Sequence, residues 1–283
     1  MTGFFMSVIQ VQALNKTFDK NKALNNVCLS IESGQMVALI GASGSGKSTL
    51  IRHIAGLVKG DRDSGEIQVL NQIIQKNGRL GRGVRKVRSD VGVVFQQFNL
   101  INRISVLTNV LLGYLGQISS WRGTLGIFSH AEKRRAMDAL ARVGIDALAS
   151  QRSSTLSGGQ QQRAAIARTI TQGAKVILAD EPIASLDPAC CRTVMDTLQR
   201  INREDEVTIL VSLHQVEYAM QYCPRTIAMR QGEVVFDGPS EKLTPQFLKQ
   251  LYGDQSLELI GNKNQEEPVE NIYPDNVAAF ATA

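Results

Sequence analysis

One turn of nine residues limits the possible folds of this chain more than any other stretch. It is rich in glycine and serine, and it consists of Gly41, Ala42, Ser43, Gly44, Ser45, Gly46, Lys47, Ser48 and Thr49. A short apolar run at residues 36–40 precedes the turn, and a stretch with helical spacing at residues 50–57 follows it. The spacing fits the pattern G-x-x-x-x-G-K-[ST], and its setting of strand, loop and helix is the one that this pattern requires.

Each residue type in this turn suits the binding of a triphosphate. Glycines lack the Cβ atoms that would keep a backbone away from a phosphate, so successive N–H groups can surround the anion. The start of the following helix adds its positive dipole end. Lys47 can reach the β- and γ-phosphates, and the hydroxyl of Ser48 can bind Mg²⁺. The sequence therefore predicts a nucleoside triphosphate site.

Composition describes a soluble globular chain. Of its 283 residues, 43% are hydrophobic and 20% are charged, and no apolar run approaches the roughly 18–20 residues that cross a bilayer. Residues 1–6 lack the regions of a signal peptide, so we expect any membrane role to depend on a partner. The formal charge is +5, and this basic excess fits a solvated surface at least as well as a nucleic-acid or membrane surface.

Periodicity predicts an α/β fold with a largely parallel sheet. Short apolar or alternating runs predict strands near residues 8–14, 23–31, 66–70, 91–95, 176–179 and 207–211, and a hairpin at 227–236. The pattern is mostly helical from about Phe98 to Thr171, with Ser129 as the N-cap of an amphipathic helix. Helical stretches separate the later strands, as in parallel α/β sheets.

Two other segments stand out by charge. The segment at residues 79–88 contains four arginines and one lysine, and we expect a basic surface loop there. Periodicity fails after about Gly253, and residues 254–283 carry six acidic residues and one basic residue. This acidic tail is predicted to be disordered.

Further candidate site residues follow one another along the chain. They are Phe18, Gln96, the run Leu156, Ser157, Gly158, Gly159 and Gln160, the carboxylates Asp180 and Glu181, then Asp187 and His214. Phe18 could stack on adenine or belong to the core, and Gln96 could meet Mg²⁺ or the attacking water. Taken singly, Gln96 or His214 would more often be an ordinary surface or core residue, whereas LSGGQ after such a turn is highly specific.

This ordered set resembles the ATP-binding subunits of ABC transporters. The resemblance covers residues 7 to about 250 and implies a P-loop NTPase cassette, with a RecA-like core, an antiparallel β-subdomain and a helical subdomain. We therefore expect one ATP-binding domain at residues 7–253, with the helical subdomain inserted at about 98–171. The turn at 41–49 corresponds to the Walker A motif of this family.

The resemblance implies ATP and Mg²⁺ as ligands. Mg²⁺ would be held by Ser48 and by Asp180, which ends a Walker B strand, with Gln96 of the Q-loop near it. Glu181 would accept a proton from the attacking water or orient it, and His214 would hold the γ-phosphate and this water in line.

The same resemblance implies a homodimer. Residues 156–160 match the signature motif and Asp187 the D-loop, and both would face the P-loop of a second copy, with ATP between the chains. The backbone N–H groups of Ser157 and Gly159 are expected to contribute to that second phosphate site.

The single cassette favours an importer subunit that docks under separate permease subunits at the cytoplasmic face of the inner membrane. Residues 98–110 would help to form the docking groove, and a periplasmic binding protein would act only indirectly; no nucleic-acid partner is expected. Several stretches, among them residues 78–88, 95–103, 117–121 and 179–188, resemble phosphonate importer ATPases more closely. Import of another solute, such as phosphate or a polar amino acid, and a soluble role in the carbon–phosphorus lyase complex remain open alternatives.

Overall fold

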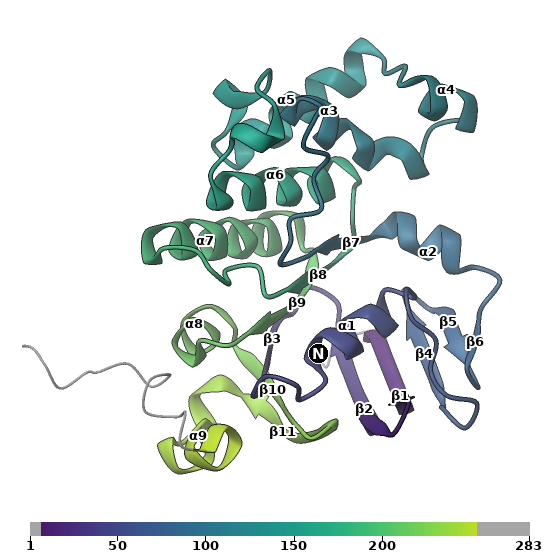
Figure 1. The fold of residues 1–283 in the computed structure, drawn as a ribbon, viewed down its shortest axis with the longest axis vertical. Helices are drawn as coiled ribbons and strands as arrows, with labels where there is room; N and C mark the ends of the chain where they lie inside the picture. The colour runs from purple at the N-terminus through teal and green to yellow at the C-terminus, as the bar shows by residue number, and fades with distance from the viewer. Residues whose placement is uncertain (1–6, 254–283) are drawn as a thin grey trace, which may run out of the picture.

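Two β-sheets organise the fold, as the computed structural model shows for residues 7–253 (Figure 1). The smaller sheet has the strand order β2-β1-β4-β5-β6, and its paired neighbours are antiparallel. Its strands are β1 (Ser7–Phe18), β2 (Asn21–Glu32), β4 (Glu66–Val69), β5 (Gln72–Lys76) and β6 (Arg79–Leu80).

The larger sheet has the order β11-β10-β3-β9-β8-β7 and is parallel except for β11. Its strands are β3 (Met36–Ile40), β7 (Val91–Val94), β8 (Val176–Asp180), β9 (Thr208–Leu213), β10 (Arg225–Arg230) and β11 (Glu233–Pro239). Every residue of β3, β8 and β9 is buried, which explains why these strands consist largely of apolar residues instead of alternating.

Helices cover both faces of this sheet. They are α1 (Lys47–Ile54), α2 (Val84–Asp90), α3 (Val106–Leu111), η1 (Leu112–Gly116), α4 (Ser120–Leu125), α5 (His130–Arg142), η2 (Asp146–Leu148), η3 (Ser153–Thr155), α6 (Gly158–Thr171), α7 (Pro188–Asp205), α8 (Val216–Tyr222), η4 (Ser240–Lys242) and α9 (Pro245–Tyr252). Successive side chains of β3 point to opposite faces of the larger sheet and join two separate hydrophobic clusters. Val37 and Leu39 pack with α1 and the smaller sheet, whereas Ala38 packs with α6 and α7. The helices α3 to α5 lie together at one end of the molecule (Figure 1).

Most local predictions agree with these elements. The stretch ending at Thr171 is mainly helical, and Ser129 caps α5, where it forms a reciprocal capping box with Glu132. The predicted hairpin is confirmed as β10 and β11. No helix within residues 7–253 is long and apolar enough to cross a membrane.

The prediction of a basic loop at residues 79–88 is wrong. Strand β6 and part of helix α2 occupy this segment, and α2 is anchored by buried Val87 and by Arg88, whose guanidinium donates to the carbonyl of Gly56. The basic side chains concealed the two apolar residues, Val84 and Val87, that pack the helix against the core. The predicted acidic tail, residues 254–283, lies outside the described residues.

Candidate active site

The glycine-rich turn joins β3 to α1 and requires glycine at specific points. Gly46 has φ +104°, and a Cβ there would lie 2.6 Å from the carbonyl oxygen of Ala23. Gly41 has φ +148°, and a Cβ there would lie 2.2 Å from the carbonyl oxygen of Met229. The loop can therefore pass close to β2 and β10 only because these side chains are absent.

Lys47 and Ser45 give the inside of this loop its polar groups. Lys47 is buried, and its Nζ donates to the carbonyl oxygens of Gly41 at 2.7 Å and Ala42 at 3.1 Å. Burial lowers the pKa of Lys47, against the opposing effect of the carboxylates of Glu181 and Asp180. The hydroxyl of Ser45 is buried without a partner among the described residues. A cation and an unpaired donor at one loop fit an anionic ligand such as a phosphate.

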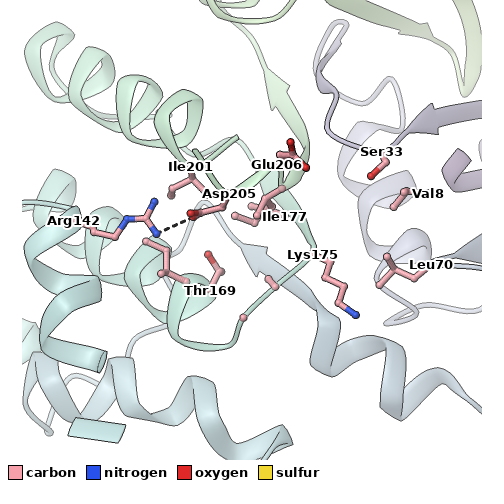
Figure 2. A pocket seen from close by; sticks show the side chains of 14 residues that line it. Val8, Ser33, Leu70, Arg142, Thr169, Lys175, Ile177, Ile201, Asp205 and Glu206 are labelled. Atoms are coloured by element: carbon pink, nitrogen blue, oxygen red, sulfur yellow. Dashed lines mark hydrogen bonds and ion pairs between the residues drawn. The ribbon is translucent and has the colours of Figure 1, made fainter. Parts of the chain in front are cut away.

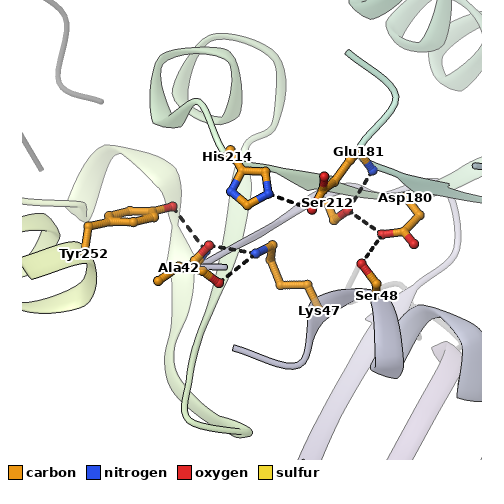
Figure 3. Close-up of polar contacts among 9 residues, drawn as sticks. Ala42, Lys47, Ser48, Asp180, Glu181, Ser212, His214 and Tyr252 are labelled. Atoms are coloured by element: carbon orange, nitrogen blue, oxygen red, sulfur yellow. Dashed lines mark hydrogen bonds and ion pairs between the residues drawn. The ribbon is translucent and has the colours of Figure 1, made fainter. Parts of the chain in front are cut away.

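Sheet register brings the carboxylates to this loop. Strand β9 pairs with both neighbours so that Ile40 lies opposite Leu213 and Asp180 lies opposite Ser212. The carboxyl ends of β3, β8 and β9 thus meet at one edge, where ligands bind in sheets of this type. There, Ser48 Oγ donates to Asp180 Oδ1 at 2.8 Å (Figure 3). A hydroxyl and a carboxylate in contact are suitable ligands for Mg²⁺.

Ser212 joins the two carboxylate residues. Its hydroxyl donates to Asp180 Oδ1 at 3.0 Å and accepts the N–H of Glu181 at 2.9 Å (Figure 3). Glu181 has φ +52°, a left-handed conformation that is uncommon for a residue with a side chain and is held here by these contacts. Ser212 is not among the residues predicted from the sequence; the available signal was a hydroxyl inside an apolar strand, two residues before His214.

Glu181 and His214 form a direct pair across the edge of the sheet. His214 Nε2 lies 2.6 Å from Glu181 Oε1, and both side chains are only partly exposed. This contact lowers the pKa of Glu181; burial acts in the opposite direction, and the charge of Lys47 adds to the lowering. Glu181 is therefore an ionised carboxylate at neutral pH, as a group that orients or deprotonates water requires.

Two predicted residues stand apart from this cluster. Gln96 lies just beyond β7 at the same edge of the sheet, but it is exposed and makes no hydrogen bond with residues 7–253. Phe18, at the end of β1, is 46% exposed, and Lys16 Nζ lies 5.0 Å from its ring centre. Phe18 is therefore a surface residue and not a core residue, and its ring is accessible to a stacking partner.

The LSGGQ run and Asp187 form a second group. Ser157 caps α6: its hydroxyl accepts the N–H of Gln160 at 3.3 Å, and Gln160 Oε1 accepts the N–H of Ser157 at 2.9 Å. Asp187 caps α7 by accepting the N–H of Cys190 at 3.0 Å, and Gly159 packs against Cys190. The N–H of Ser157, expected to bind phosphate, is thus already paired. Within residues 7–253, this group makes no hydrogen bond with the turn at 41–49.

A cavity of about 560 Å³ lies elsewhere (Figure 2). It is lined by the ends of α6 and α7 and by Lys175 and Val207, which directly precede β8 and β9, so it lies at the opposite edge of the larger sheet. Arg142 is paired there with Asp205 at 2.8 Å. None of the predicted site residues lines this cavity.

Comparison with known proteins defines the class. Residues 24–184 match the model of the ABC transporter family, so the chain belongs to this family and is an ABC-type ATPase. It is 61% identical over 248 residues to phosphonates import ATP-binding protein PhnC 1 of Pseudomonas aeruginosa, covering 87% of this chain and 89% of that protein. A protein of the same name from Cupriavidus metallidurans is 59% identical over 261 residues, or 92% of each chain.

Solved structures agree with this assignment. The dimeric post-hydrolysis state of the ATP-binding cassette MJ0796, bound to ADP and Pi, superimposes with a TM-score of 0.72 at 33% identity. The superposition covers 83% of this chain and 100% of the MJ0796 chain. The fold class predicted from the sequence is thereby confirmed.

Proposed function

We propose that this chain is the ATP-hydrolysing subunit of an ABC importer that takes up phosphonates. The observation that carries the substrate class is the 59–61% identity, over about nine tenths of the chain, to proteins named for phosphonate import. The site described above supports the ATP-hydrolysing part independently.

In this proposal the turn at 41–49 receives the phosphates. Lys47 exchanges the carbonyl oxygens of Gly41 and Ala42 for phosphate oxygens, and Ser48 and Asp180 separate to hold Mg²⁺. Mg²⁺ held by Ser48 and Asp180 would supply positive charge to offset the charge of the phosphates. Gln96 has no hydrogen-bond partner within residues 7–253 to give up, and it would turn toward the metal from the same edge.

Glu181 and His214 carry out the hydrolytic step in this proposal. The ionised Glu181 carboxylate orients the attacking water and accepts its proton, while His214 releases Glu181 and supports the γ-phosphate. Phe18 stacks on the adenine ring through its exposed face.

We also propose that two copies complete each site. The LSGGQ run and Asp187 lie together at the starts of α6 and α7 and make no hydrogen bond to the loop of their own chain. A second copy would bring Ser157, Gly158, Gly159 and Gln160 to the γ-phosphate, once Gln160 releases the N–H of Ser157. ATP then lies between two chains.

A groove of about 470 Å³ provides the proposed permease contact. It lies between α2, β7 and η1, and Leu57, Phe95 and Leu112 are among its apolar lining residues, with Arg85 and Arg88 beside them. Residues 98–110, where the sequence predicted the docking groove, do not line it. Leu57 is 49% exposed, which is consistent with a surface that a permease helix covers. Through this contact the chain would be peripheral at the cytoplasmic face of the inner membrane, and it would meet a periplasmic phosphonate-binding protein only indirectly.

Uptake of radiolabelled 2-aminoethylphosphonate tests the proposal. Cells that lack their own phosphonate ATPase subunit, but keep its permease and binding protein, receive either the wild-type chain or Glu181→Gln, with phosphate uptake as the control. Phosphonate uptake by the wild type alone, with equal phosphate uptake, supports the proposal. Equal phosphonate uptake in both strains contradicts it, and recovery of the chain without the membrane fraction favours the lyase-associated alternative.

A further inference from the structure

The last residue of α9 contacts the first glycine of the nucleotide-binding loop. Helix α9 starts at a capped turn, in which Thr244 accepts the N–H of Phe247 and Pro245 occupies the first helical position. Phe247 packs against Phe236 of β11, with ring centres 5.4 Å apart. These contacts hold α9 beside the hairpin of β10 and β11, and β10 is the neighbour of β3.

Tyr252 reaches from this helix to the loop. Its hydroxyl accepts the N–H of Gly41 at 3.1 Å in a buried contact, and its side chain is 6% exposed (Figure 3). Gly41 lies one residue beyond the end of β3, where the strand no longer pairs with its neighbours. Its N–H therefore donates to the hydroxyl of Tyr252 and not to another strand. Burial raises the pKa of Tyr252 to about 12, so the hydroxyl is neutral at physiological pH.

Gly41 is therefore confined on three sides. Its N–H is held by Tyr252, its carbonyl oxygen accepts Lys47 Nζ at 2.7 Å, and the carbonyl of Met229 lies close to its Cα. Of these contacts, the one with Lys47 must be lost when Lys47 turns to a phosphate. The contact with Tyr252 can persist in both states, because it lies on the preceding peptide unit.

We propose that Tyr252 is a positioning residue for nucleotide binding: its hydroxyl holds Gly41 so that the loop is already shaped for phosphate before ATP arrives. This inference rests on the proposed ATPase function and extends it to an element 211 residues away from Gly41 in sequence. Tyr252 does not touch the reacting atoms, so its effect falls on binding and not on hydrolysis.

Tyr252→Phe separates these effects, since it keeps the ring and removes only the hydroxyl. The N–H of Gly41 then lacks a partner in the closed loop, and the free protein relieves this by letting the loop move toward water. ATP must restore the closed shape, so KM and the nucleotide Kd rise about three- to tenfold. Once ATP is bound the geometry is that of the wild type, and kcat stays within about twofold.

Tyr222→Phe is the matched control. Tyr222 is also 6% exposed, and its hydroxyl donates to Asp196 at 2.8 Å between α8 and α7, away from the loop. We expect both variants to lower the melting temperature, but only Tyr252→Phe to raise KM and to accelerate hydrogen exchange in the peptide around residues 36–46 of the nucleotide-free protein.

The outcomes are separable. If Tyr252→Phe keeps the wild-type KM and exchange rate, or lowers kcat at constant KM, Tyr252 has no positioning role. If the full-length wild-type chain itself neither binds nor hydrolyses ATP, the proposed function fails instead. If Tyr252→Phe folds poorly, the hydrogen-exchange rate of the Gly41 amide in the wild-type protein, measured below its melting temperature, decides the question. An exchange rate as fast as that of an unstructured loop overturns the inference.

Discussion

Replacement of Ser212 by alanine tests whether one buried hydroxyl aligns both carboxylates of the site. The side chain is fully buried, and its Oγ donates to Asp180 and accepts the N–H of Glu181. Alanine is smaller than serine, so the variant can keep the same backbone conformation. It lacks the hydroxyl, however, and therefore loses both hydrogen bonds. Asp180 keeps Ser48 as a partner, whereas the N–H of Glu181 loses the only partner that it has within residues 7–253.

The magnitude follows from these two losses. A hydrogen bond to a charged group contributes about 1.5–3 kcal/mol, and a buried unpaired N–H costs about 1–3 kcal/mol. Glu181 also occupies a left-handed conformation that stores about 1–3 kcal/mol and depends on this N–H contact. We expect unfolding free energy to fall by about 2–3 kcal/mol, and kcat to fall roughly 10–100-fold as Glu181 relaxes out of line.

Steady-state ATPase assays and urea denaturation measure the two quantities on the same samples. Thr208→Val is the control, because Thr208 lies on the same strand at its other end and its hydroxyl accepts the N–H of Gly34 at 2.9 Å. The control should lose stability and keep kcat. If Ser212→Ala retains wild-type kcat, or if both variants lose kcat in proportion to stability, Ser212 does not align the two carboxylates.

Three further predictions concern the dimer, the loop and pH. Glu181→Gln should bind ATP and accumulate as a dimer in size-exclusion chromatography, since hydrolysis is blocked after binding; a variant that stays monomeric with ATP would contradict this. Lys47→Ala should weaken a fluorescent nucleotide at least about tenfold in titration, because it removes a buried cation from the phosphate site; unchanged affinity would exclude Lys47 as a phosphate ligand. The pKa of Tyr252 is raised from 10.0 to about 12, so the folded state holds the hydroxyl proton more tightly than the unfolded state does. The contribution of this hydroxyl to stability should be complete below pH 10 and should be lost as the pH rises to 12. That loss is about 3 kcal/mol in denaturant titrations, and Tyr252→Phe should show a shallower alkaline decline than the wild type; identical slopes would contradict the assignment.

Local patterns in the sequence were sufficient for several parts of the protein. The glycines of the turn at 41–49, the apolar runs of β3, β8 and β9, and the capping residue Ser129 act through neighbours within a few positions. Their consequences can therefore be derived without knowing where distant segments lie. The order of motifs then predicted the fold class, which the comparisons confirm.

Local patterns failed where a residue contacts a partner far away in the sequence, or where few apolar residues hold a segment against the core. Residues 79–88 form β6 and part of α2 because Val87 enters the core and Val84 packs against it, and these two apolar residues stand among basic side chains. Phe18 could be stacking surface or core on sequence grounds, and only the packed structure leaves its ring exposed.

The sequence by itself determined which chemical groups are present and which ends of strands carry them, because backbone geometry links these features over short distances. Only the tertiary structure decided that Ser212 joins Asp180 to Glu181 and that Tyr252 holds Gly41. These contacts span 31 to 211 residues, and they exist because sheet register and the packing of α9 bring the segments together. No periodicity in the chain encodes such a distance, so the shape of this site is a property of the assembled fold.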